Sequence, residues 1–147
     1  DRKETTKMLL GEYMQTVDAK GRVNVPAKFR DDLGQVFVVS KGLNCVSLYP
    51  KDEWKKFLDN IISENPTKRK KLLRFFSSGS QECEVDSQGR VLIPAQYREY
   101  AGTGKEIAVI GSYTYAEIWD RQKWSEYMDD PEFEAGEIEK AMEEYGL

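Results

Sequence analysis

Arginine side chains in one recurring pattern are the clearest candidates for binding chemistry in this sequence. An aspartate is followed three residues later by a glycine and then by an arginine, as Asp18-Gly21-Arg22 and again as Asp86-Gly89-Arg90. A guanidinium can donate paired N–H bonds to a guanine edge or to a phosphate, whereas a lysine supplies a mobile point charge. The same spacing permits an aspartate–arginine ion pair that stiffens a turn. The pattern therefore supports two interpretations, a polyanion-binding site and a structural salt bridge.

Histidine is absent from the 147 residues, and its absence removes most catalytic chemistry. Neither a Ser-His-Asp nor a Cys-His nucleophilic system can be built, and there is no imidazole to bind a metal. The acidic pair Asp31-Asp32 has no glycine-rich phosphate loop or metal-ligand cluster beside it. We therefore expect no enzyme, no catalytic or metal-binding residue, no cofactor and no small-molecule substrate.

The formal net charge of −4 hides an uneven distribution along the chain. Residues 129–147 contain eight acidic residues and one basic residue, a charge of −7, whereas the preceding 128 residues carry +3. Apolar residues in this acidic stretch have roughly helical spacing, at Phe133, Ile138, Met142 and Tyr145. The spacing predicts an amphipathic helix, whose acidic face is either solvated or docked on a partner. We assign residues 123–147 to a C-terminal helical, acidic segment.

An internal repeat contains the elements that must position both arginine motifs. Residues 17–30 return as residues 85–98, with eight of fourteen positions identical. A unit of about 45 residues buries too little apolar surface to fold alone. We therefore expect repeat 1, residues 8–50, and repeat 2, residues 80–122, to complete one another's core within a single domain.

Each repeat is expected to form a hairpin around its Asp-x-x-x-Arg turn. Aspartate at the first position and glycine at the fourth are typical of a type I turn. Pro26 is expected to begin a short helix that ends near Gly34. Alternating or apolar runs predict strands over residues 22–25, 36–40, 45–49, 82–85, 106–111 and 114–119.

Residues 51–79 are expected to form a helical connector between the repeats. Their apolar spacing predicts a helix over 52–64, ended by Pro66, and a second helix over 67–76. The second helix carries a basic cluster, Lys68, Arg69, Lys70, Lys71 and Arg74. This cluster is either a solvated face or a patch that contacts phosphates.

Cysteine usage and hydropathy indicate a reducing compartment. Cys45 and Cys83 match no zinc or redox spacing, so we expect buried free thiols in strands. No apolar run approaches the length of a membrane span, which predicts a cytoplasmic protein with no membrane partner. Residues 1–7 are polar and precede Met8, so we expect a leader from an expression vector or an upstream start.

Taken together, these motifs resemble the MraZ family of bacterial transcription regulators, which carry two SpoVT-AbrB-type repeats. The resemblance spans Met8 to about Tyr145. Besides the two arginine motifs, it rests on Gly11-Glu12-Tyr13, Leu48-Tyr49-Pro50, Glu53-Trp54, Val109-Ile110-Gly111 and Glu117-Ile118-Trp119-Asp120. It implies an α+β fold with a pseudo-two-fold duplicated SpoVT-AbrB-type swapped-hairpin β-barrel core and flanking helices.

The resemblance also implies a function. The resemblance implies that the protein forms a ring-shaped homo-oligomer. This oligomer would regulate the division and cell-wall gene cluster by binding short direct repeats in the DNA near a promoter. The resemblance therefore also predicts that the protein binds double-stranded DNA and is associated with the nucleoid. The competing function is a protein-binding ring scaffold or an antitoxin-like module, which would use the acidic tail or the helices of Trp54 and Trp124.

The two copies of the motif are not expected to contribute equally to DNA binding. The predicted DNA contacts are Arg22, Lys20, Asn24, Lys28, Arg30 and Arg90. The residues expected to shape the motifs are Asp18, Gly21, Pro26, Asp86, Gly89 and Pro94. In the second copy, the positions of Lys20, Asn24 and Lys28 are occupied by Gln88, Leu92 and Gln96. The first copy should therefore dominate, Arg90 either contacts DNA or only pairs with Asp86, and Arg98 should be structural.

Overall fold

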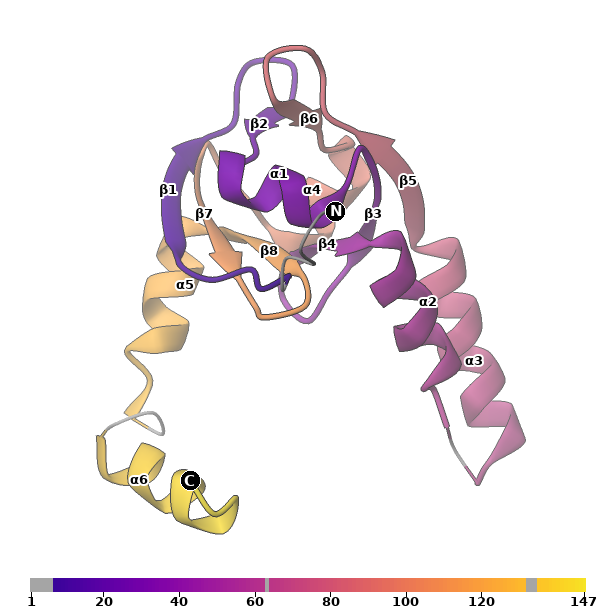
Figure 1. Cartoon of the computed structure of the whole chain (residues 1–147), viewed down its shortest axis with the longest axis vertical. Coiled ribbons are helices and arrows are strands. Elements are labelled where there is room, and N and C mark those ends of the chain that lie inside the picture. Colours follow the sequence, from indigo (N-terminus) through magenta and orange to yellow (C-terminus); the bar gives the residue numbers. More distant parts are fainter. Residues whose placement is uncertain (1–6, 63, 132–134) are drawn as a thin grey trace, which may run out of the picture.

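The computed structural model describes residues 7–62, 64–131 and 135–147 as an α+β protein (Figure 1). Residues 1–6 of the expected leader lie outside this description, as do residues 132–134 of the expected acidic segment, including Phe133. None of the helices described is long and apolar enough to cross a membrane.

Five elements occur in the same order in both repeats. The first repeat forms β1 (Glu12–Thr16), β2 (Arg22–Asn24), α1 (Ala27–Leu33), β3 (Val36–Lys41) and β4 (Val46–Pro50). The second repeat forms β5 (Ser80–Glu84), β6 (Arg90–Leu92), α4 (Ala95–Ala101), β7 (Glu106–Gly111) and β8 (Ala116–Asp120). The repeat in the sequence is therefore also a repeat in structure.

The strands pair across the two repeats. One antiparallel sheet has the order β1-β7-β8-β4-β3-β5, and β2 and β6 form a second, two-stranded sheet. The first strand of each repeat thus lies beside the third strand of the other, as β1 beside β7 and β5 beside β3. β1 and β2 find their ladder partners in the other repeat, while Asp18 N–H still donates to the Arg22 carbonyl at 2.9 Å across the expected turn. The expected swapped-hairpin barrel is not confirmed, since the described strands form an open order that ends at β1 and β5.

The core lies between the six-stranded sheet, α1, α4 and the inner face of β2 and β6. Phe29 of α1 and Tyr97 of α4 are almost completely buried, and so are Val23 and Val91, which face each other across β2 and β6. Pro26 directly precedes α1 rather than lying in its first turn. Its φ of −50° and ψ of 138° are those of extended chain entering a helix.

Two turn residues explain why β4 and β8 begin later than expected. Asn44 and Tyr113 adopt left-handed φ angles of 64° and 68°. Gly42 N–H then donates to the Cys45 carbonyl at 2.9 Å, so Cys45 closes the turn and β4 begins only at Val46. Cys45 is therefore a buried free thiol in a turn, not in a strand, whereas Cys83 is free and half-buried within β5.

The remaining helices project from the sheet at two places. Between the repeats lie α2 (Lys51–Asp59) and α3 (Pro66–Ser78), and after β8 come α5 (Arg121–Met128) and α6 (Ala135–Glu144). In Figure 1, α2 and α3 extend to the lower right and α5 and α6 to the lower left, while the two arginine-bearing turns rise at the top.

The boundary between α2 and α3 differs from the expectation. The first helix ends at Asp59, and beyond it Ile61 is half-buried while Ile62 is exposed. Pro66 is the first residue of α3 rather than the residue that ends α2. The Asn65 side chain accepts hydrogen bonds from Thr67 N–H and Lys68 N–H at 3.0 and 3.2 Å, which caps this helix.

Candidate nucleic-acid interface

The first arginine motif is a turn organised around one carboxylate. Asp18 Oδ1 accepts hydrogen bonds from the backbone N–H groups of Lys20 and Arg22, each at 2.9 Å. Asp18 Oδ2 accepts from Arg22 Nε at 2.7 Å. The Gly21 N–H donates to the Asp18 carbonyl at 3.0 Å, which closes the turn. Asp18 thus fixes both the backbone of the turn and the direction of the Arg22 guanidinium.

The second motif repeats this geometry almost bond for bond. Asp86 Oδ1 accepts from the backbone N–H groups of Gln88 and Arg90 at 2.9 Å, and Asp86 Oδ2 accepts from Arg90 Nε at 3.0 Å. Gly89 N–H donates to the Asp86 carbonyl at 3.0 Å. The predicted ion pair is therefore present in both copies, and it orients each guanidinium.

Pairing of β2 with β6 places the two turns side by side. Arg22 lies opposite Leu92, and Asn24 lies opposite Arg90. Because side chains alternate along a strand, these four residues share the outer face while Val23 and its partner on β6 point into the core. The cross-strand pairing continues into the turns, where Val25 N–H donates to the Gly89 carbonyl at 3.0 Å.

The two motifs also share an ion pair. Arg90 Nη1 lies 3.9 Å from Asp18 Oδ2, so the first carboxylate faces arginines from both repeats. Among the described residues, the Arg22 guanidinium donates through Nε alone, which leaves its Nη groups for an outside acceptor. Both arginine side chains are about a quarter exposed, at 29% for Arg22 and 26% for Arg90.

Hydrogen bonding keeps both aspartates ionised. The Arg22 backbone N–H, the Arg22 guanidinium and the Lys20 N–H together lower the pKa of Asp18 from its ordinary 3.8 to about 2. The Arg90 backbone N–H is the main cause that lowers the pKa of Asp86. Each motif therefore presents a guanidinium that is positioned by an aspartate whose pKa is lowered.

Two further arginines support the turns from beneath. Gly21 and Gly89 are buried, with left-handed φ angles of 85° and 78°. A Cβ on Gly21 would lie 2.9 Å from Arg98 Nη2, and a Cβ on Gly89 would meet the Arg30 guanidinium. Arg98 Nε also donates to the Ile93 carbonyl at 3.0 Å. Each turn is thus covered by an arginine from the helix of the other repeat.

The other predicted contacts occupy different positions around this surface. Lys20 is exposed within the first turn, Asn24 is exposed on the outer face of β2, and Lys28 is exposed on α1. Arg30 is exposed but directed towards the second turn rather than the first. The structure thus brings Arg22, Asn24 and Arg90 together on one face, and it places the Arg30 guanidinium against Gly89, the residue before Arg90.

Leu92 is the residue of this surface that the sequence did not indicate. It is 54% exposed, directly opposite Arg22. An apolar side chain at this place is suited to contact the methyl group of a thymine. Its alternation with buried Val91 and Ile93 was the available signal, because that alternation turns position 92 outward.

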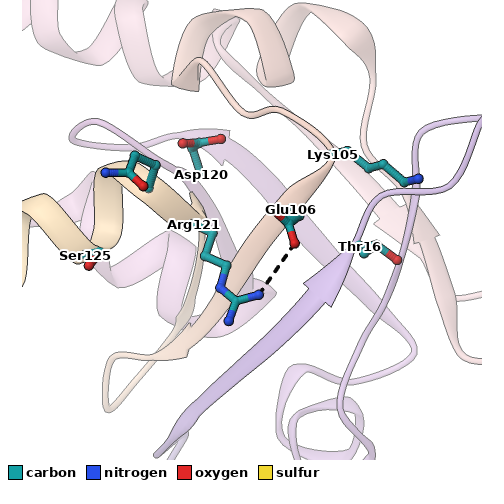
Figure 2. A pocket seen from close by; sticks show the side chains of 7 residues that line it. Thr16, Lys105, Glu106, Asp120, Arg121 and Ser125 are labelled. Carbon is teal, nitrogen blue, oxygen red and sulfur yellow. Dashed lines mark ion pairs between the residues drawn. The ribbon is translucent and has the colours of Figure 1, made fainter.

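A hollow with a volume of about 660 Å3 lies at the junction of β7, β8 and α5, apart from the arginine motifs (Figure 2). Arg121 Nη1 pairs with Glu106 Oε1 at 3.6 Å across it, and Lys105 points away from this pair. Within residues 7–62, 64–131 and 135–147, no cluster of three acidic or cysteine ligands could hold a metal ion. The hollow brings none of the predicted DNA contacts together.

The cysteines have no activated thiolate. Burial, followed by the charge of Glu117, raises the pKa of the Cys45 thiol, and burial raises the pKa of Cys83 to about 12. Both thiols are therefore protonated at neutral pH and are poor nucleophiles.

Comparison with known proteins identifies the family. A family model described as "MraZ protein, putative antitoxin-like" matches residues 8–74 and 76–144. A protein of Alkaliphilus oremlandii named Transcriptional regulator MraZ is 46% identical over 144 residues, which cover 95% of this chain and 100% of that protein. Proteins of the same name from Alkaliphilus metalliredigens and Caldicellulosiruptor saccharolyticus are 44% and 45% identical, again with 95% and 100% coverage. Their shared name is that of a regulator, in agreement with the expected absence of enzyme activity. With both motifs and both repeats present, this chain belongs to the MraZ family.

Proposed function

We propose that this protein is a transcriptional regulator that binds double-stranded DNA through the paired outer face of β2 and β6. The observation that carries the proposal is the pairing itself, which sets Arg22, Asn24 and Arg90 on one surface between two rigid turns. A two-stranded ribbon fits the major groove of B-DNA, where an arginine fork can read guanine. The relatives named as transcriptional regulators support this reading.

Each residue has a distinct part in the proposed contact. Arg22 is held at Nε by Asp18 and presents its Nη groups to a base edge or a phosphate. Asn24 is placed to bond a base edge beside it, while Lys20 and Lys28 neutralise phosphates as mobile charges. Arg90 is the second guanidinium of the same surface. Arg30 belongs to the predicted contacts, although its position beneath Gly89 favours support of the turn.

Repetition of this surface in an oligomer completes the proposal. The repeats 8–50 and 80–122 act as one DNA-binding domain, with the connector 51–79 and the acidic segment 123–147 outside it. A homo-oligomeric ring would present the same surface many times to short direct repeats near the promoter of the division and cell-wall gene cluster. Linked contacts raise the apparent affinity by roughly 100-fold or more when their spacing matches. Such a protein is associated with the nucleoid.

Titration of labelled duplex tests this function. Promoter DNA with direct repeats is compared with a scrambled duplex of the same composition at two salt concentrations. We expect repeat-specific binding that weakens with salt, because phosphate contacts release counterions. Arg22→Ala should nearly abolish this binding, whereas Arg98→Ala should only reduce it. Equal affinity for both duplexes, or no effect of Arg22→Ala, would overturn the proposal.

A further inference from the structure

The outer face of α3 carries an apolar groove that its own chain leaves open. Leu72 and Phe75 are 39% and 40% exposed, whereas Phe76 turns inward and packs on Phe57 with ring centroids 4.9 Å apart. The groove has a volume of about 370 Å3, and Lys68 and Lys71 complete its lining. Large apolar side chains at helical spacing on an exposed face are typical of a site that a second helix covers.

This groove lies within a strongly basic helix. Five of the thirteen residues of α3 are basic and none is acidic. Within the described part of the chain, none of these five side chains forms an ion pair with a carboxylate. The occupant of the groove should therefore combine an apolar stripe with negative charge.

The α6 helix has both properties. Ile138 and Met142 are 48% and 44% exposed, and Tyr145 follows them on the same stripe just after the helix. Glu137 and Glu139 flank this stripe at about 100° to either side. The helix carries four glutamates and one lysine, and every side chain described between residues 136 and 144 is exposed.

We propose that α6 of one chain docks in the α3 groove of a second copy of the chain. The exposed apolar residues Leu72 and Phe75 of α3 lie within one helical turn of each other, and so do Ile138 and Met142 of α6, so one apolar turn of each helix can pack against the other. Figure 1 shows α3 and α6 at opposite sides of the molecule, so the two surfaces meet between copies rather than within one chain. A contact between unlike surfaces is heterologous and repeats head to tail, which closes a ring when the rotation permits.

The structure favours a second copy over DNA as the occupant of α3. Leu72 and Phe75 would gain little from a phosphate backbone, but they match the apolar stripe of α6. In Figure 1, α3 also lies far from the paired turns of β2 and β6. This inference deepens the assembly part of the proposed function and does not depend on DNA binding.

Charge reversal on each surface tests the docking. One full-length variant carries K68E and K71E, and the other carries E137K and E139K. Light scattering without DNA should show wild-type protein at a multiple of the 17.0 kDa chain mass. Each variant alone should lose most of this assembly. An equimolar mixture should recover it, because reversed α6 now faces reversed α3 and the unchanged surfaces still match. Circular dichroism verifies that both variants are folded.

Matched controls separate this interface from a general effect of charge. Lys70→Glu and Glu143→Lys change charges on the same helices but on faces turned away from the stripes, so both should keep the wild-type mass. Arg22→Ala should also keep that mass even though it loses DNA binding, so the two proposals fail separately. A monomeric wild-type chain, or a mixture that stays dissociated, would overturn the docking. Unchanged mass with weakened DNA binding in the K68E/K71E variant would overturn it too and would assign α3 to phosphates.

Discussion

Arg90 spans the boundary between the repeats, with Nε 3.0 Å from Asp86 and Nη1 3.9 Å from Asp18. Arg22 makes only the bond to its own aspartate among the described residues. The pseudo-symmetry is therefore broken at this point, because Asp18 faces two guanidinium groups and Asp86 faces one. The two aspartates should differ in their effect on DNA recognition.

Asp18→Asn should lower the discrimination between repeat and scrambled DNA by roughly 10-fold, the scale of one well-aligned base contact. The amide can still accept the backbone N–H bonds, but it no longer directs two guanidinium groups. Loss of a negative charge should at the same time raise affinity for scrambled DNA. Competition titrations on both duplexes measure the ratio. Asp86→Asn is the matched control with the smaller expected change, and an equal loss in both variants would contradict the shared role of Asp18.

Arg22→Lys should bind repeat DNA more weakly than wild type, although less weakly than Arg22→Ala. Lysine keeps the charge, but it cannot donate through Nε to Asp18 and through a planar fork to a guanine at once. We expect roughly a 10-fold loss of specific affinity, with little change on scrambled DNA. Fluorescence anisotropy titrations of both duplexes at one salt concentration measure the specific and the non-specific affinity separately. Full retention of specific binding by lysine would show that only the charge at position 22 matters.

Gly89→Ala should destabilise the fold. Its left-handed φ of 78° costs about 1–2 kcal/mol for a residue with a Cβ, and that Cβ would also displace the Arg30 guanidinium. Urea denaturation should show the loss as a lower midpoint. Gly136→Ala is the control, because nothing lies within 4 Å of its added Cβ and alanine favours a helix. Equal midpoints for the two variants would contradict the strained turn.

Stability should fall as the pH falls from about 4 to about 2. The pKa of Asp18 is about 2 in the folded protein and about 3.8 when the chain is unfolded, so the unfolded state takes up protons first. The stabilisation from ionised Asp18 is complete above pH 3.8, the pKa of the unfolded chain, and it is lost as the pH falls through about 2, the pKa of the folded protein. Urea midpoints measured across this range should show a shallower decline in Asp18→Asn than in wild type. If the midpoints of Asp18→Asn and wild type declined in parallel, groups other than Asp18 would be the cause of the pH dependence.

The sequence predicted the repeated elements well, because each has a local signal. The spacing of Asp18, Gly21 and Arg22 defines a turn, and alternation shows which side chains of β2 and β6 face inward. Alternation cannot tell which strand lies alongside, since pairing partners such as Glu12 and Ile110 are distant in the chain. The local pattern therefore could not identify the partner of each strand or the Arg90–Asp18 contact.

The supporting arginines and the end of α2 have the same explanation. The position of Arg30 on a short helix after the first motif predicts an exposed side chain that faces DNA. In the structure, its guanidinium lies against Gly89, in the turn of the other repeat. Apolar Ile61 and Ile62 continue the helical spacing of α2, but Ile62 is exposed, and the helix ends at Asp59. In both cases the deciding contact, or its absence, is tertiary.

Exchange of strands between the repeats has a consequence for synthesis of the chain. β1 is translated well before its partner β7, because the strands from β2 to β6 lie between them in the chain. Pairing over such a sequence separation slows folding, because a long loop must close before the contact forms. The first strand therefore leaves the ribosome with an unsatisfied edge, and the nascent protein must wait for its second half before either half can become stable.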